Sequence, residues 1–88
     1  MEKVELKVSS KTNPNSLAGA IASLLKEGKT INIKTIGAGA LNQAIKGITI
    51  ARGFVVVQGI EINCVPSFYS AEIDEQELSA IMLTISKI

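Results

Sequence analysis

Hydrophobic and polar residues alternate along two early stretches of the chain, residues 4–8 (VELKV) and 30–36 (TINIKTI). In the first stretch, Val4, Leu6 and Val8 fall on one side of an extended backbone, and Glu5 and Lys7 fall on the other. A period of two is typical of a strand with one buried face. Two later apolar stretches, 59–70 and 77–88, are separated by the polar segment 71–76. The pattern therefore predicts four strands.

The segment between the first two strands has a helical pattern. Its apolar residues, such as Leu17, Ile21 and Leu25, recur at the spacing of one helix face. Asn13 followed by Pro14 is typical of an N-cap and a proline at the first helical position. Gly28 suits a C-terminal stop. A first helix is therefore expected from residue 14 to about residue 27.

A second helix is expected over residues 40–53, directly after the glycine-containing turn 36–39 (IGAG). Gly53 can end this helix. One side carries polar residues, among them Asn42, Gln43 and Lys46, and the other side forms an apolar stripe. The stripe consists of Leu41, Ala44, Ile45, Ile48 and Ala51.

The predicted order is β-α-β-α-β-β within a single domain spanning residues 1–88. Because the alternation leaves one face of the strands polar, both helices are expected on the same face of one four-stranded mixed sheet. This is an α/β two-layer sandwich. Pro66 cannot donate to a strand ladder, so its strand is expected at an edge or at a bulge.

Charge is unevenly distributed along the chain, although the net formal charge is only +1. The first 53 residues carry eight basic and three acidic side chains, a formal charge of +5. The remaining residues carry one basic and five acidic side chains, a charge of −4. Such asymmetry indicates either an electrostatic binding footprint or ordinary solvated faces. A domain this small also gains stability from pairing with another copy.

The residue types give no positive case for an enzyme, a metal site or a cofactor. Histidine is absent, so the commonest general base and metal ligand is missing. Cys64 is the only cysteine; it lies in an apolar strand, where a buried small hydrophobic residue is expected. The acidic cluster at residues 72–77 is expected to be a solvated tip, because it lacks the ligand spacing of a calcium loop. No signal peptide or membrane span is visible, which favours a cytoplasmic protein.

The glycine turn matches neither common nucleotide fingerprint. The third glycine of the dinucleotide motif is replaced by Asn42, and the triphosphate-binding loop pattern is absent. Two interpretations remain. Gly37 and Gly39 either expose backbone N–H groups to an anion at a helix N-terminus or simply allow a tight turn.

Three segments carry a resemblance that spans nearly the whole chain: KVSSKTNPNSLAGAIASLL, IGAGALNQAIKGITIARGF and INCVPSF. They resemble the stage V sporulation protein S family, which is similar in fold to the Alba chromatin and RNA-binding proteins. The resemblance implies a small, non-enzymatic, nucleic-acid-binding regulator that forms a homodimer or a higher oligomer. In spore formers the family acts late in sporulation, on spore-coat assembly and core dehydration.

Alba-like proteins place the first loop and the second helix on the nucleic-acid backbone and dimerise through the second helix and neighbouring strands. By this resemblance, Gly47 and Ile50, on or near the exposed side of the second helix, are expected at a dimer axis. Lysine and arginine would neutralise phosphates, and asparagine and glutamine would donate to phosphate or sugar oxygens. The nucleic-acid contacts expected in this way, DNA or RNA, are Lys11, Asn13, Asn15, Lys34, Gly37, Gly39, Asn42, Gln43, Lys46 and Arg52.

The final hairpin departs from the Alba pattern, because residues 71–77 contain four acidic and no basic side chains. Phosphate would repel such an arm, so it should not enter a groove of nucleic acid. The departure leaves a second interpretation open, in which the protein is an interaction scaffold that docks a basic protein partner through this hairpin.

Overall fold

The computed structural model describes residues 2–88 as four strands and two helices. In chain order these are β1 (Lys3–Val8), α1 (Pro14–Lys26), β2 (Thr30–Thr35), α2 (Ala38–Val56), β3 (Ile62–Ile73) and β4 (Gln76–Lys87). The strands form one sheet in the spatial order β1-β2-β4-β3. β1 and β2 are parallel, whereas β4 runs antiparallel to both β2 and β3.

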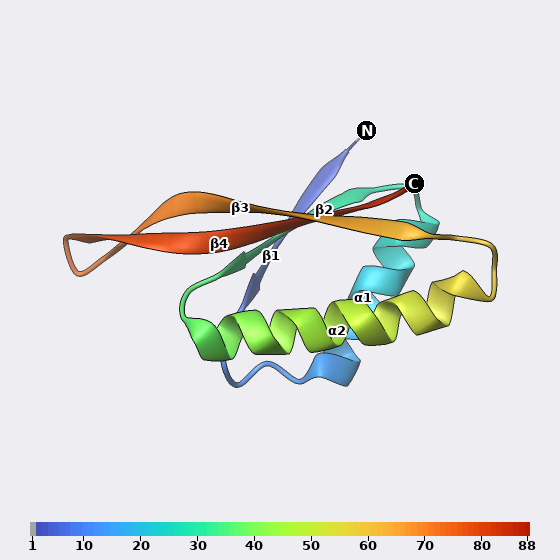
Figure 1. The fold of residues 1–88 in the computed structure, drawn as a ribbon, viewed down its shortest axis with the longest axis horizontal. Helices are drawn as coiled ribbons and strands as arrows, with labels where there is room; N and C mark the ends of the chain where they lie inside the picture. Colours follow the sequence, from blue (N-terminus) through green and yellow to red (C-terminus); the bar gives the residue numbers. More distant parts are fainter. Residues whose placement is uncertain (1) are drawn as a thin grey trace.

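Both helices lie on the same side of the sheet (Figure 1). The predicted element order and the two-layer α/β sandwich are therefore confirmed, and the arrangement is consistent with an Alba-like fold. β3 lies at an edge of the sheet, as Pro66 predicted. Neither helix among residues 2–88 is long and apolar enough to span a membrane.

The hydrophobic core lies between the two helices and the inner face of β1, β2 and β4. The alternation along β2 places Ile31 and Ile33 on this face, opposite Ile85 and Leu83 of β4. Burial of each large aliphatic side chain contributes roughly 1.5–3 kcal/mol, so this cluster accounts for much of the stability. The large apolar side chains that are fully buried are Ile21, Leu25, Ile31, Ile33, Val55 and Ile85.

The ends of α1 follow the sequence prediction. Asn13 Oδ1 accepts hydrogen bonds from the backbone N–H groups of Asn15 (2.8 Å) and Ser16 (3.2 Å), so Asn13 is the N-cap. Pro14 occupies the first helical position. Beyond the last turn, Gly28 adopts a φ of +79°, which glycine tolerates without steric cost.

The end of α2 and the length of the last hairpin differ from the prediction. α2 continues past Gly53 to Val56, because the apolar stripe extends to Val55, which is completely buried. β3 and β4 continue through the segment 71–76, expected as a loop, and are joined by a two-residue turn at Asp74 and Glu75. Both turn residues have positive φ, as in the tight turns that match strand twist. The resulting hairpin projects past the start of α2 (Figure 1).

Candidate nucleic-acid interface

The loop between β1 and α1 is held in one conformation by local hydrogen bonds. Ser9 N–H donates to Thr12 Oγ1 (2.9 Å), and Thr12 N–H donates to the Ser9 carbonyl (3.1 Å). The N-cap role of Asn13 engages its side-chain oxygen. Lys11, at the tip of the loop, is exposed. The loop therefore presents the Lys11 ammonium from an ordered turn.

Gln43 connects this loop to α2. Its Nε2 donates to the Thr12 carbonyl at 2.9 Å, and the side chain is half-buried. The Asn42 amide, which is exposed, lies 3.5 Å from Gln43 Oε1. Gln43 thus has a structural role that the sequence did not reveal, and Asn42 remains on the open surface beside it.

The glycine turn has a structural reason for each of its glycines. Gly37 adopts a φ of +90°, which an L-amino acid with a side chain rarely adopts. A Cβ at Gly39 would lie 2.9 Å from Ser10 Cβ, so the glycine allows the first loop to approach α2. These observations account for the turn without a ligand, and anion binding at the turn stays a prediction.

Asn15 and Lys46 line one groove, although they come from different helices. The groove has a volume of about 330 Å³ and lies between the start of α1 and the middle of α2; we call it the α1–α2 groove. Within residues 2–88, neither Lys11 nor Lys46 makes an ion pair. Both ammonium groups are therefore available to an external anion. The groove is lined by Pro14, Asn15, Ile45, Lys46, Thr49 and Ile50.

Lys34 and Arg52 are not part of this surface. Lys34 lies on the opposite face of the sheet, where its Nζ is 3.0 Å from Glu5 Oε2. Arg52 forms a bidentate ion pair with Glu61, through bonds of 2.9 Å and 2.8 Å. These two bonds and a third from the Ile62 N–H lower the pKa of Glu61 to about 2. The charge of each cation is therefore already matched within the chain.

The predicted position of Gly47 on the exposed side of α2 is wrong. Gly47 is buried, and a Cβ there would lie 2.6 Å from Leu17 Cδ2 of α1 in the same chain. The close helix contact that the glycine permits is therefore the α1–α2 contact. Ile50 lies partly exposed in the α1–α2 groove, and its place at a dimer axis stays a prediction.

An exposed apolar surface that the sequence did not reveal lies on β3. Cys64, Pro66 and Phe68 pair with core residues of β4 and so share the sheet face that carries the helices. No helix covers them, since β3 is the edge strand, and Phe68 is 80 % exposed. We call these three residues the β3 patch. The expectation that Cys64 is buried is wrong, although partial desolvation of its thiol still raises its pKa.

The β3 patch continues onto the flank of α2. Leu41 lines a cavity of about 300 Å³ together with Ile81 of β4, the register partner of Phe68. Ile45, one turn after Leu41, was expected within the buried stripe but is 44 % exposed. Leu41 and Ile81 therefore connect the β3 patch to α2, whereas Ile45 also lines the α1–α2 groove.

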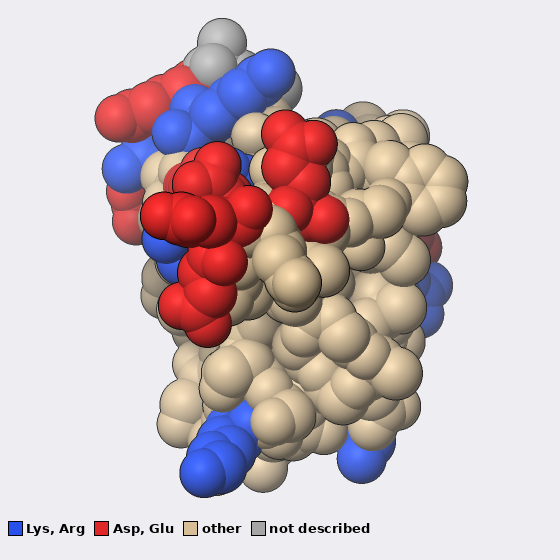
Figure 2. All heavy atoms as spheres, turned by 90° about the vertical axis from the view of Figure 1, so that its left-hand side faces the viewer, with Lys and Arg blue, Asp and Glu red and all other residues tan. Residues whose placement is uncertain are grey.

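The acidic side chains of the hairpin gather at its tip. Glu72, Asp74, Glu75 and Glu77 are all exposed, and none makes an ion pair among the described residues. Viewed from the hairpin end, the molecule shows acidic side chains in its upper part, with Lys or Arg side chains directly beside them at the upper left and others at the lower margin (Figure 2).

A family model described as "Stage V sporulation protein S (SpoVS)" matches residues 4–88. The match covers every strand and helix described above except the first residue of β1.

Proposed function

Because this chain belongs to the Stage V sporulation protein S family, a family of small sporulation-related proteins, we propose that it is a non-enzymatic, cytoplasmic nucleic-acid-binding regulator. It binds the phosphate backbone of DNA or RNA with little sequence specificity. The observation that carries this proposal is the α1–α2 groove, which Asn15 and Lys46 both line. Lys11 is exposed in the loop that precedes α1. Free ammonium groups next to amide donors suit the phosphate and sugar oxygens of a nucleic-acid backbone.

The composition of the surface favours backbone binding over base reading. The groove contains no aromatic side chain, and single-strand recognition by base stacking depends on aromatic platforms. Lys34 and Arg52 add little to the footprint, since their carboxylate partners lie within the same chain. The minimal contact surface is therefore Lys11, Asn15, Asn42 and Lys46.

A salt titration tests this proposal directly. Binding of the purified protein to labelled duplex DNA, structured RNA and single strands is measured by fluorescence anisotropy over a series of salt concentrations. Log affinity should fall linearly with log salt, and the slope reports the number of phosphates contacted. The double variant Lys11→Gln/Lys46→Gln should reduce the slope by about 2.

The matched control is Lys3→Gln/Lys87→Gln, which removes the same charge at the opposite end of the sheet. Lys3 pairs with Thr30 at the start of β2, and Lys87 is the last residue of β4. This control should leave the slope unchanged. Equal effects of the two double variants would mean that net charge, and not the groove, drives binding.

The protein acts as a homodimer in this proposal, assembled through the β3 patch and the adjoining flank of α2. Monomeric proteins rarely leave contiguous apolar surface of this kind in water. Phe68→Asp should convert a dimer into a monomer in sedimentation experiments. Val57→Asp is the matched control, because Val57 is 82 % exposed and lies beyond the end of α2. Dissociation by both variants, or by neither, would contradict this interface.

A second function is favoured by the projecting acidic hairpin, which would dock a basic protein partner. Unpaired carboxylates on an arm that extends past α2 are accessible to such a partner (Figure 1). Neutralising Glu72, Asp74 and Glu75 should then impair function while leaving or strengthening nucleic-acid affinity. An absence of nucleic-acid binding at low salt would favour this function over the first.

A further inference from the structure

A second cavity, of about 510 Å³, lies on the helix-free side of the sheet. It opens at the carboxyl ends of the parallel strands β1 and β2 and extends to β3. Its volume is in the range of small-molecule sites, ~300–1,000 Å³. The α1–α2 groove shares no lining residue with it, so this cavity is separate from the proposed nucleic-acid interface.

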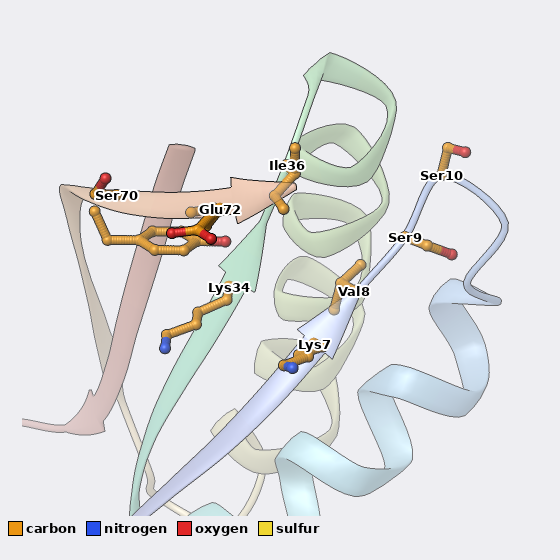
Figure 3. Close-up of a pocket in the computed structure, with 10 residues that line it drawn as sticks. Lys7, Val8, Ser9, Ser10, Lys34, Ile36, Ser70 and Glu72 are labelled. Atoms are coloured by element: carbon orange, nitrogen blue, oxygen red, sulfur yellow. The ribbon is translucent and has the colours of Figure 1, made fainter. Parts of the chain in front are cut away.

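One side of the cavity is cationic. Lys7 and Lys34 are register partners on neighbouring strands, and their side chains leave the same face of the sheet. Lys7 makes no ion pair among residues 2–88, and Lys34 has one carboxylate neighbour, Glu5 at 3.0 Å. Ser9 and Ser10 follow in the loop after β1 and line the same cavity, but their side chains point away from Lys34 and Glu72 (Figure 3). The Ser9 hydroxyl accepts a hydrogen bond from the Lys11 N–H within the loop. The Lys7 ammonium suits the phosphate of a monoester, and Lys34 is a second cation on this side whose charge Glu5 already offsets.

The opposite side of the cavity is formed by β3. Tyr69 is fixed there, because its hydroxyl donates to the Thr35 carbonyl at 3.4 Å and Lys34 Nζ lies 5.3 Å from the ring centroid. Its register partner, Ala80, is small and buried. Glu72 lines the same side, across the cavity from Lys7 (Figure 3). The cavity thus combines a cationic side, an aromatic and apolar wall that includes Ile36, and a single carboxylate acceptor.

We propose that this cavity binds a nucleoside monophosphate, either free or as the terminal nucleotide of a nucleic-acid strand. The phosphate binds the Lys7 ammonium, and Lys34, whose charge is offset by Glu5, adds little to the affinity. The base or ribose lies along Tyr69 and Ile36. Glu72 accepts a hydrogen bond from an amino or hydroxyl group of the nucleoside. Inorganic phosphate would contact only the cationic side of the cavity. An unphosphorylated nucleoside would contact only the wall formed by Tyr69, Ile36 and Glu72.

The site is tested by titrating the ¹⁵N-labelled protein with adenosine, guanosine, cytidine and uridine monophosphates. Adenosine and inorganic phosphate serve as comparison ligands, and a short single strand with a 5′ phosphate tests the second source. At least one monophosphate should shift the amide resonances of residues 7–10, 34–36 and 69–72. It should also bind more tightly than adenosine or inorganic phosphate.

Variants assign the binding to this cavity. Lys7→Gln should weaken monophosphate binding by about tenfold or more, as for the loss of a charged hydrogen-bond partner. Lys3→Gln, on the same strand and face, is the control and should have no effect. Glu72→Ala, which removes the acceptor, should reduce the advantage of the nucleotide over inorganic phosphate.

The outcomes that overturn the proposal are equally specific. No resonance shift at the cavity with any ligand, or inorganic phosphate binding as tightly as every monophosphate, would refute a nucleotide site. Binding of the 5′-phosphorylated strand alone would assign the site to strand ends. The proposal is independent of the nucleic-acid interface, because Lys11→Gln/Lys46→Gln should leave monophosphate binding intact while weakening duplex binding.

Discussion

The contact between Gly47 of α2 and Leu17 of α1 gives a sharp test of how the two helices pack. Replacing Gly47 by alanine would place a Cβ 2.6 Å from Leu17 Cδ2, 2.9 Å from Cγ and 3.2 Å from Cβ. Three atoms of one buried side chain are involved, so rotating the end of the leucine cannot relieve the overlap. The helices must separate or the leucine must leave its rotamer.

The expected magnitude follows from two opposing effects. Alanine stabilises a helix interior by about 0.5–1 kcal/mol relative to glycine. Overpacking a core contact costs about 1–3 kcal/mol. Gly53, later in the same helix, has no atom within 4 Å of an added Cβ, so Gly53→Ala shows the helix effect alone. Gly47→Ala should therefore be less stable than Gly53→Ala by about 1–3 kcal/mol.

Urea denaturation of both variants at one fixed protein concentration measures this difference, because self-association would otherwise shift the midpoint. In thermal melts the same difference corresponds to roughly 4–8 °C per kcal/mol for a domain of this size. A Leu17→Ala background should remove the penalty at Gly47, which gives a double-mutant cycle with a coupling energy of about 1–3 kcal/mol. If Gly47→Ala stabilises the wild-type protein as much as Gly53→Ala does, the packing of α1 on α2 is not as described.

Two further predictions concern the end of a helix and the pH dependence of an ion pair. Asn13→Ala should lower the free energy of unfolding by about 1 kcal/mol, because two N–H groups of α1 lose their acceptor; Asn13→Asp should retain most of the stability, and equal urea midpoints for the alanine variant and wild type would contradict the cap. The pKa of Glu61 in the folded protein, about 2, lies below its ordinary value of 4.5, so the stabilisation by Arg52 is present above pH 4.5 and is lost as the pH falls through about 2. The difference in urea midpoint between wild type and Glu61→Gln should therefore be constant near neutral pH and shrink in acid, and a difference at pH 2 as large as that at pH 7 would contradict this pairing.

Much of the fold was determined by local sequence signals. The period-two pattern of residues 4–8 and 30–36 and the helical spacing around Leu17 and Ile21 specify which element forms, because each element must bury one face. Asn13, Pro14 and Gly28 set the ends of α1 through backbone hydrogen bonding and φ preference, which depend on neighbouring residues alone. Gly53 did not end α2, because burial of Val55 in the core outweighs the weak helix propensity of one glycine.

The candidate sites depended on contacts between residues far apart in the chain. Sequence identified Lys11, Asn15 and Lys46 as candidates, but only the packing of α1 on α2 places Asn15 and Lys46 in one groove. Lys34 and Arg52 were also candidates for phosphate binding, but each has a carboxylate partner in the folded protein. Lys34 pairs with Glu5 across the sheet, and Arg52 pairs with Glu61 before β3. Which cations remain free is a property of the tertiary structure.

The exposed surface of β3 illustrates the same division. The sequence determined that Cys64, Pro66 and Phe68 share one face of a strand, and Pro66 predicted an edge or a bulge, of which the sheet order shows the edge. Only the position of α2 decided that this face is left uncovered, and that the small residue facing α1 is Gly47. The periodicity of the sequence indicates which side of a helix or strand is apolar. The positions of the helices over the sheet decide which of these apolar sides is buried within the chain and which is left exposed to a partner.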